Sequence, residues 1–379
     1  METGTDQLLL LSRTGAGHVL KFDLSFGILS KKPELDTWNQ IVNLKEFSCV
    51  SHKQFIYVLG GYSTKLKRPI QNVKRYDVIT NEWTDLTSME NERRMATAVV
   101  FKDEIVICGG FKNSSKLHAS TEIYNIAHNK WRKGPSFKIG ISDIQLLVVN
   151  DSILGFGGMK NSIYKNETIL CSNDEIYEYK NNGNEWSTLD ENVPFILSKP
   201  VYNHSVVEME SKIYIIGGLK TVIQSNGEIN EIINTKAESL CVDENQLKML
   251  TRNHIKDWIS PWDRSLSPPN IPRYGAAAIS LGSDIYLFGG VSDNLSNCIY
   301  EVERFNTKRA RWNIEFVIKH EADLSLVSAL CVYGSLYKSQ HSKLVESVVS
   351  NNNVEAIVEM ITEPVSLQKK MYKVGWVLW

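Results

Sequence analysis

The sequence predicts an all-β protein, a six-bladed β-propeller, and three repeated features carry this prediction. A short apolar run that ends in Gly-Gly recurs five times along the 379 residues. An aromatic residue stands seven positions before a tryptophan after four of these pairs. An alternating apolar stretch precedes several of the runs. Repeats of about 50 residues are typical of propellers, in which each repeat forms one small sheet.

The Gly-Gly runs are predicted to be buried strands. Short apolar runs that are rich in β-formers and bounded by glycine favour strands over helices. Glycine also permits positive φ and close backbone approach where such a strand ends. The runs are FIYVLGG (55–61), EIVICGG (104–110), SILGFGG (152–158), KIYIIGG (212–218) and DIYLFGG (284–290).

The aromatic–tryptophan pairs predict two further strands per repeat. The pairs enclose turn-rich segments and are Tyr76 and Trp83, Tyr124 and Trp131, Tyr179 and Trp186, and Phe305 and Trp312. With the alternating stretches MATAVVFKD, NHSVVEMES and GAAAISLGS before three of the runs, one repeat holds four strands. A lone four-stranded sheet leaves both faces bare, so the repeats are expected to stack radially, with the aromatic side chains between them.

Residues 71–110 carry a family resemblance. QNVKRYDVITNEWTDLTSMENERRMATAVVFKDEIVICGG contains V-x-x-Tyr-Asp, Thr-Asn-x-Trp and Met…Arg-Arg, in the order found in Kelch repeats. The chain resembles most the Kelch domain of BTB–Kelch (Kelch-like) adaptor proteins, over residues 5–337. The resemblance implies a protein-recognition module. Because the predicted strands begin near residue 6, no BTB or BACK domain is expected in this chain.

The two ends of the chain are expected to complete blade one. DQLLLLSR reads as a second strand, HVLKFDLS as a third strand with Phe22 at the aromatic position, and Trp38 as the fourth-strand tryptophan. Residues 324–337 resemble a first strand without a second. Pairing of these N- and C-terminal strands would close a ring of six blades within residues 1–337. Residues 338–379 then form a C-terminal extension. The sequence leaves three alternatives open for it: a docking tail, an edge strand or a flexible extension.

The repeat after Gly218 departs from the pattern. The interval from Gly218 to the next Gly-Gly pair is the longest in the chain, so this blade is expected to carry an insertion. AESLCVDENQLKML is the candidate third strand, and Trp258 or Trp262 is the candidate fourth-strand tryptophan.

Composition predicts a protein of the cytoplasm. The formal net charge of −1 gives no general attraction to nucleic acid or to an acidic membrane. The six cysteines are scattered without CxxC pairs, so neither a structural zinc site nor a disulfide framework is expected. The N-terminus lacks the basic and long apolar regions of a signal peptide, and no segment is long enough to span a membrane.

No catalytic or cofactor-binding motif is apparent. The eight histidines occur singly, and the sequence contains no P-loop, HExxH or nucleophile-elbow pattern. His204 is a candidate for a site near the propeller axis, but a structural role is favoured. We therefore expect no catalytic residues, no metal and no cofactor. A small-molecule enzyme with its site at the axis is the least favoured alternative.

Loops at one end of the ring are the expected binding surface. The resemblance implies two loop sets, one directly after Gly-Gly and one directly before the next innermost strand. The first set contains Tyr62, Phe111, Met159, Leu219 and Val291, with Asn113 two positions beyond Phe111, and the second contains Lys45, Arg94, Ser142, Tyr202 and Tyr274. The residues expected to bind a partner are Lys45, Tyr62, Arg94, Phe111, Asn113, Tyr202 and Tyr274. Lys45 and Arg94 suggest that the surface accepts an acidic group.

Two kinds of protein partner remain open. The resemblance to Kelch-like adaptors favours a substrate or partner of a ubiquitin ligase. Many Kelch proteins bind actin, so a cytoskeletal scaffold is the alternative. An actin co-sedimentation assay and a pull-down of cullin-type ligase subunits separate the two.

Overall fold

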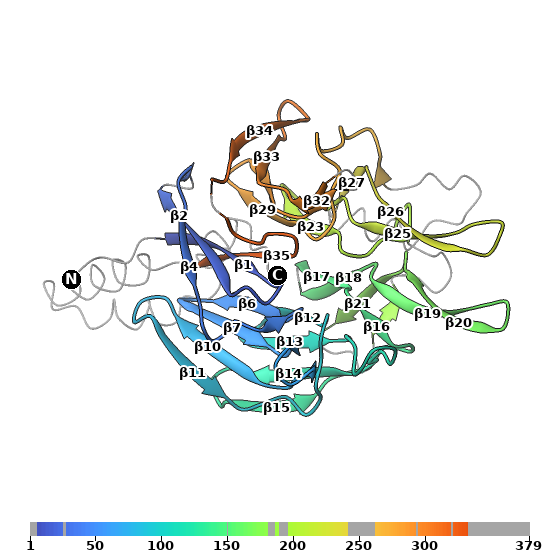
Figure 1. Ribbon diagram of the computed structural model, residues 1–379, viewed down its shortest axis with the longest axis horizontal. Coiled ribbons are helices and arrows are strands. Elements are labelled where there is room, and N and C mark those ends of the chain that lie inside the picture. Colours follow the sequence, from blue (N-terminus) through green and yellow to red (C-terminus); the bar gives the residue numbers. More distant parts are fainter. Residues whose placement is uncertain are drawn as a thin grey trace, which may run out of the picture.

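The computed structural model describes residues 6–25, 28–149, 151–180, 186–188, 196–241, 262–292, 295–319 and 321–332. Every regular element within these ranges is a β-strand, as the sequence predicts. The strands form six main sheets and four smaller ones, and the main sheets are arranged around a common centre (Figure 1). The predicted extension, residues 338–379, lies outside the described residues.

Five of the main sheets are four-stranded antiparallel units in chain order. The second sheet contains β6 (Ser48–His52), β7 (Phe55–Leu59), β10 (Val73–Asp77) and β11 (Glu82–Leu86), and the third contains β12 (Thr97–Phe101), β13 (Glu104–Cys108), β14 (Thr121–Asn125) and β15 (Lys130–Lys133). The fourth contains β17 (Gln145–Val149), β18 (Ser152–Phe156), β21 (Ile176–Lys180) and β22 (Ser187–Thr188). The fifth contains β23 (Ser205–Met209), β24 (Lys212–Ile216), β27 (Ala237–Cys241) and β28 (Trp262–Asp263), and the sixth contains β29 (Ala277–Leu281), β30 (Asp284–Phe288), β33 (Glu301–Asn306) and β34 (Arg311–Val317).

The first sheet combines both ends of the described chain. Its strands are β1 (Asp6–Ser12), β2 (His18–Ser25), β3 (Ile28–Leu29), β4 (Glu34–Thr37) and β35 (Val327–Val332). β1 pairs with β35 antiparallel from Gln7 opposite Val332 to Ser12 opposite Val327. The predicted pairing of N- and C-terminal strands is therefore present in this sheet.

The innermost strands contact one another in cyclic order. β6 contacts β12, β12 contacts β17, β17 contacts β23, β23 contacts β29, β29 contacts β35, and β35 contacts β6. The Gly-Gly runs form the second strand of five sheets, and Ser12 takes the corresponding position at the end of β1 in the first. Large apolar clusters fill the spaces between adjacent sheets, as radial stacking requires.

The aromatic–tryptophan pairs face each other across neighbouring strands. Tyr76 is opposite Trp83, Tyr124 is opposite Trp131, and Phe305 is opposite Trp312. In the irregular fifth sheet Leu240 is opposite Trp262, so Trp262 takes the fourth-strand tryptophan position and the candidate Trp258 lies outside the described residues. In the second, third and sixth sheets, a tight turn between the paired strands sets the register.

Phe22 and Trp38, the aromatic residue and the tryptophan assigned to blade one, do not face each other. β2 and β4 pair so that Lys21 is opposite Glu34 and His18 is opposite Thr37, and Trp38 follows the end of β4. Trp38 is buried against Tyr76 and Trp83 of the second sheet, while Phe22 packs against Phe288 and Phe316 of the sixth. The long connection between β2 and β4 shifts the register, so the two side chains stabilise opposite sides of the first sheet.

Candidate functional site

The two predicted loop sets meet residue by residue at one end of the molecule. In each sheet from the second to the sixth, the residue after Gly-Gly pairs with the residue that was assigned to the other set. The pairs are Tyr62 with Lys45, Phe111 with Arg94, Met159 with Ser142, Leu219 with Tyr202, and Val291 with Tyr274. We call this end of the molecule the loop face.

Gly-Gly creates the close approach on which this pairing depends. Gly109 has a φ of 64°, and an added Cβ there would lie 2.4 Å from the carbonyl oxygen of Ile141, far inside van der Waals contact. The amide of the next residue, Gly110, donates a hydrogen bond of 2.8 Å to that same oxygen. The glycine pair therefore joins the second strand of one sheet to the chain that enters the next sheet.

Five of the seven predicted contact residues are at least partly exposed on the loop face. Lys45 and Asn113 are exposed, while Tyr62, Arg94 and Tyr274 are half-buried. Lys45 has no ion pair with any described residue. The Asn113 side chain accepts hydrogen bonds from the amides of Ser115 and Lys116, so it shapes its own loop.

Phe111 and Tyr202 do not offer surface to a partner. Each side chain is 3% exposed, which places both in packing positions. The sequence could not reveal this, because the direction of a loop side chain depends on strand pairing with distant residues.

Arg94 is already engaged within the chain. Its guanidinium donates to the carboxylate of Glu46 at 2.6 Å, and its Cζ lies 4.8 Å from the Phe111 ring centre and 6.0 Å from that of Tyr62. The expectation that Arg94 attracts an acidic partner group is therefore weakened, since Glu46 compensates its charge. Arg94 instead links the second and third sheets and supports Tyr62.

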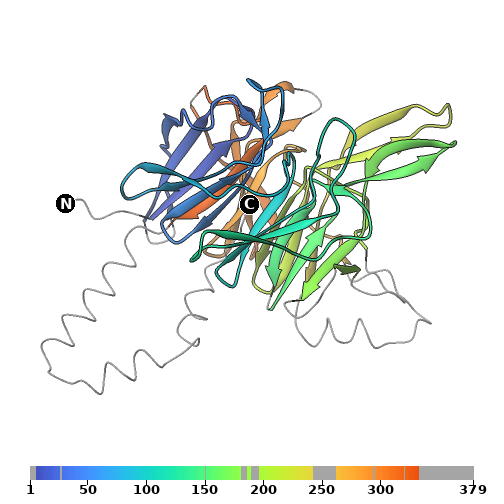
Figure 2. The ribbon, with the colours of Figure 1, turned by 90° about the horizontal axis from the view of Figure 1, so that it is seen from below.

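Two hairpins rise from the fourth and fifth sheets and extend the loop face. The first consists of β19 (Met159–Tyr164) and β20 (Glu167–Ser172), and the second of β25 (Leu219–Ile223) and β26 (Ile229–Ile233). Both views show them projecting side by side (Figures 1 and 2). The Ser172 and Thr221 side chains each accept a hydrogen bond of 3.0 Å from the other residue's amide, which holds the hairpins together.

A small satellite core under the hairpins explains the burial of Tyr202. The tyrosine packs with Met159, Leu219 and Ile233, and its hydroxyl donates to the Glu231 carboxylate. Burial and Glu231 together raise the pKa of Tyr202, so the phenol stays protonated. Tyr202 therefore anchors the second hairpin.

The hairpins were not predicted as such, although the sequence contains a signal for each turn. Asn226-Gly227 stands between two apolar stretches, a pattern that favours a tight hairpin. Lys165 and Asn166 both have positive φ, 48° and 68°, in the turn between β19 and β20.

The shorter strands of the loop face are β5 (Leu44–Lys45), β8 (Tyr62–Ser63), β9 (Arg68–Pro69), β16 (Ile141–Ser142), β31 (Val291–Ser292) and β32 (Leu295–Cys298).

A collar of hydrogen bonds runs around the innermost strands on the loop face. Its backbone bonds span 2.8 to 3.1 Å, and the series returns to Arg13 through the consecutive residues Leu326 and Val327. The donor–acceptor pairs are Glu46 N to Arg13 O, Met95 N to Glu46 O, Asp143 N to Met95 O, Asn203 N to the Asp143 carboxylate, Gly275 N to Asn203 O, Val327 N to Gly275 O, and Arg13 N to Leu326 O. Glu46, Met95, Asp143 and Asn203 all have φ near +50°, a conformation held by this bonding.

Asp143 is the one collar member that uses its side chain to continue the series. Burial, with a smaller contribution from the carboxylate of Glu46, raises its pKa to about 7, whereas the Asn203 amide and Arg13 oppose the shift. The proton on Asp143 therefore exchanges near neutral pH. Asp143 is a titratable group that the sequence did not single out.

His204 is a core residue. It is 2% exposed, and neither ring nitrogen has a hydrogen-bond partner among the described residues. Burial lowers its pKa to about 3, so the ring is neutral. An added Cβ at Gly157 would lie 3.0 Å from the Cε1 of His204, which places the ring against the Gly157 backbone.

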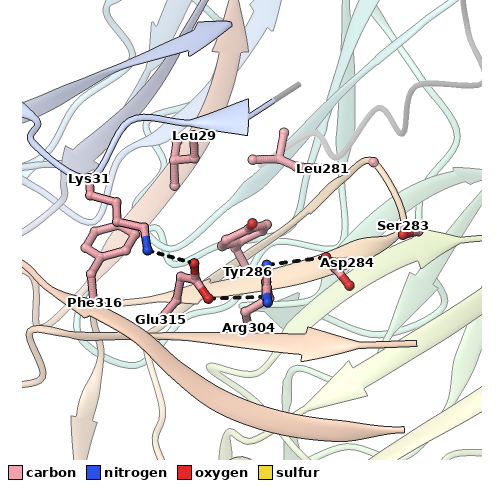
Figure 3. A pocket seen from close by; sticks show the side chains of 10 residues that line it. Leu29, Lys31, Leu281, Ser283, Asp284, Tyr286, Arg304, Glu315 and Phe316 are labelled. Atoms are coloured by element: carbon pink, nitrogen blue, oxygen red, sulfur yellow. Dashed lines mark ion pairs between the residues drawn. The ribbon is translucent and has the colours of Figure 1, made fainter. Parts of the chain in front are cut away.

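A cavity of about 410 Å³ lies at the opposite end of the molecule, between the first and sixth sheets. Figure 3 shows its ion pairs, in which Glu315 contacts Lys31 at 3.0 Å and Arg304 at 3.3 Å, and Arg304 contacts Asp284 at 3.8 Å. Leu29 and Leu281 line its apolar side. These ion pairs link the two sheets. Because the charged side chains neutralise one another, the cavity presents no surplus charge.

The described residues contain no group of three or more His, Cys, Asp or Glu side chains arranged to hold a metal. None of the six cysteines forms a disulfide. Within the same ranges, no helix has the length and apolarity needed to cross a membrane.

Comparison with known proteins agrees with the repeat architecture. The Attractin/LZTR1 β-propeller family matches residues 34–227, just over half of the chain, and the Kelch motif matches residues 272–315. A solved structure described as YjhT covers 83% of this chain and 97% of its own, with a TM-score of 0.62 and 13% sequence identity, which shows the shared fold.

Curated relatives carry Kelch names. Human Kelch-like protein 23 (Homo sapiens) is 24% identical over 259 residues, 68% of this chain and 39% of that protein. Kelch-like protein 41b of Danio rerio is 30% identical over 37% of this chain and 23% of its own length. The Kelch repeat protein M-T8 of Myxoma virus is 22% identical over 76% of this chain and 47% of its own. The matched regions span less than half of each of these relatives. Because the Attractin/LZTR1 β-propeller match covers just over half of the chain, the chain belongs to this family of Kelch-repeat β-propellers.

Proposed function

We propose that the chain is a closed six-bladed Kelch propeller that recognises another protein through its loop face. The six main sheets, the cyclic contacts of their innermost strands and the collar support six blades and a closed ring. We place the propeller in residues 1–337 and treat residues 338–379 as an extension. The Kelch-like relatives support the general role of a protein-interaction module.

The observation that carries the proposal is the one-to-one pairing of the two loop sets. The pairing forms one continuous rim on a rigid scaffold, and Lys45, Tyr62 and Tyr274 stand on this rim with exposed or half-buried side chains. Tyrosine and a cation on a rigid rim are typical of protein interfaces. No catalytic step, cofactor, nucleic acid or membrane is part of the proposal.

The proposed partner is a substrate or subunit of a ubiquitin ligase, in a cytoplasmic setting. The names of the curated relatives place them among Kelch-like proteins, and the resemblance of residues 71–110 to Kelch-like adaptors supports the same class. No feature of the described residues favours the actin-binding alternative over this one. Co-sedimentation with filamentous actin distinguishes it directly.

Affinity purification with mass spectrometry tests the proposal. The triple variant Lys45→Ala, Tyr62→Ala, Tyr274→Ala should lose the partners captured by the wild type and keep its unfolding midpoint within about 2 °C. The control triple variant Lys53→Ala, Ile79→Ala, Lys130→Ala changes exposed residues in or beside turns at the opposite end and should keep the partners. Equal capture by both variants would contradict a loop-face site.

A further inference from the structure

Four cationic side chains gather on the loop face of the fifth sheet. Lys220 follows Gly218 by two residues on β25, and the carbonyl of Lys236 accepts a hydrogen bond of 3.2 Å from the Gly217 amide. Lys199 lies in the segment that enters β23. The Trp262 indole donates to the Ile196 carbonyl at 2.9 Å, and this bond brings the segment with Arg264 beside the segment with Lys199. We call Lys199, Lys220, Lys236 and Arg264 the cationic cluster.

The fifth sheet has no arginine at the position that Arg93 and Arg273 occupy in the third and sixth sheets. In the third sheet Arg93 binds Glu122, and in the sixth sheet Arg273 binds Glu303, with all four side chains almost fully buried. Arg93 and Arg273 directly precede the paired residues Arg94 and Tyr274, and the corresponding residue of the fifth sheet is Val201. Glu238 takes the position of Glu122, because each glutamate lies opposite the residue that stands two positions before the first glycine of Gly-Gly. The Glu238 carboxylate therefore has no buried arginine from this position to pair with.

The lysines are not neutralised by neighbouring carboxylates. Lys199, Lys220 and Lys236 form no ion pair with any described residue, unlike Arg94 with Glu46 and Lys160 with Glu175 on the same face. Lys220 lowers the pKa of Lys199 most, with burial, Lys236 and Arg264 acting in the same direction, whereas Glu238 opposes them. Among the described residues, the three lysines therefore carry surplus positive charge.

An apolar residue stands beside the cations. Ile232 is 42% exposed and lies directly across from Lys220 in the hairpin, so both side chains lie on the same face. An isoleucine among lysines suits a peptide that carries carboxylates around an apolar side chain. A nucleic acid or lipid headgroup would use the cations alone. The net charge of −1 provides no wider basic field that would attract either of them.

We infer that the cationic cluster and Ile232 bind an acidic peptide segment of the partner protein, with one apolar side chain packed on Ile232. The inference rests on the proposed recognition function and gives it a chemical class of partner. It moves the acid-binding role from Arg94, which Glu46 compensates, to the fifth sheet. Complementary charge sets the association rate and specificity, and the apolar contact adds affinity.

Fluorescence anisotropy with two labelled synthetic peptides tests the inference. One peptide has six glutamates around a central leucine, and the other has seven glutamates. Lys199→Glu, Lys236→Glu should weaken binding of both peptides at least about tenfold at low salt. The control Lys53→Glu, Lys130→Glu makes the same charge change at exposed positions of the opposite end and should alter binding less than about twofold.

The apolar contact has its own matched pair of variants. Ile232→Ser should weaken binding of the leucine peptide and leave the seven-glutamate peptide unchanged. Ile163→Ser, at a 79% exposed position on the other hairpin, should affect neither. The inference would be overturned if the two charge variants lost affinity for the peptides equally. It would also be overturned if phosphatidylserine vesicles or a short RNA duplex bound as tightly as the peptides and lost as much affinity in Lys199→Glu, Lys236→Glu.

Partner capture separates this inference from the proposed function. If Lys199→Glu, Lys236→Glu keeps the captured partners while the Lys45, Tyr62, Tyr274 variant loses them, the acidic-segment site is wrong and loop-face recognition stands. If neither variant loses partners, both are wrong. Thermal unfolding of each variant excludes loss of fold as the cause.

Discussion

Arg93 lies 2.9 Å from Glu122, and the side chains are 0% and 3% exposed. The guanidinium also donates to the carbonyls of Gly109 and Ser120 at 2.7 and 2.9 Å, so it joins the Gly-Gly turn to the third strand. We expect Arg93→Met to lower the free energy of unfolding by about 3 to 5 kcal/mol, because it leaves the Glu122 carboxylate buried without a cation. Urea unfolding measures the change.

Two further variants identify the cause of that loss. The double variant Arg93→Met, Glu122→Met should be more stable than Arg93→Met alone, since it removes the isolated carboxylate. Arg94→Met, the neighbouring and partly exposed arginine, should cost much less. If the double variant is no more stable than the single one, unpaired charge does not explain the effect.

Gly109 and Gly282 allow the conformational and steric effects of alanine to be separated. Their φ values are 64° and 62°, but an added Cβ meets the Ile141 carbonyl at Gly109 and nothing within 4 Å at Gly282. Gly282→Ala should cost about 1 kcal/mol through backbone strain, and Gly109→Ala at least about 2 kcal/mol more through the clash. Similar losses in the two variants, measured by urea unfolding, would refute the close approach at Gly-Gly.

Asp143 predicts a pH-dependent stability. Because burial, aided by Glu46, raises its pKa from 3.8 to about 7, the folded state binds the proton more tightly than the unfolded state. Stability should therefore fall as pH rises from about 4 to 7. Asp143→Asn keeps an oxygen to accept from the Asn203 amide and loses the charge, so it should be more stable than the wild type at pH 8 and nearly equal at pH 4.

Unfolding in urea at pH 4, 6 and 8 checks this difference. Asp151→Asn, at a carboxylate that is 92% exposed, serves as the control and should give a constant offset from the wild type. A constant offset for Asp143→Asn as well would show that Arg13 and the Asn203 amide hold the carboxylate in its usual range.

The C-terminal strand should be essential for the fold. β35 buries Ala329, Leu330 and Val332 and pairs with β1 along six residue pairs. A chain that ends at residue 323 should fail to unfold cooperatively, whereas a chain that ends at residue 337 should keep the midpoint of the full chain. Circular dichroism during heating distinguishes these outcomes, and cooperative unfolding of the shorter chain would contradict closure through β35.

Repeated residues were predictable from the sequence because local chemistry determines them. The five Gly-Gly runs form second strands, and Tyr76 faces Trp83 as their spacing predicted, since glycine conformation and tight turns act over a few residues. Phe22 and Trp38 of the first sheet do not face each other in this way, because a long connection between two strands permits more than one register. Position in the repeat, and not local propensity, identified Lys45 and Tyr62.

Loop side chains were predicted less well, because their direction depends on residues far away in the sequence. Phe111 and Tyr202 were expected at the surface, but pairing with Arg94 and Leu219 turns them into the packed layer. The cationic cluster was missed for a similar reason. Its members are far apart in the sequence, and strand pairing brings them to one end of the fifth sheet.

The pairing of β1 with β35 also has a consequence for synthesis of the chain. Leu8, Leu9, Leu10 and Leu11 are fully buried in the finished molecule, yet the strand that covers their edge is made about 320 residues later. At about 5 to 20 residues per second, a ribosome needs roughly 15 to 65 s to supply it. During that interval a row of leucines and an open strand edge are available to chaperones or to other nascent chains, so slow translation should favour aggregation of this protein.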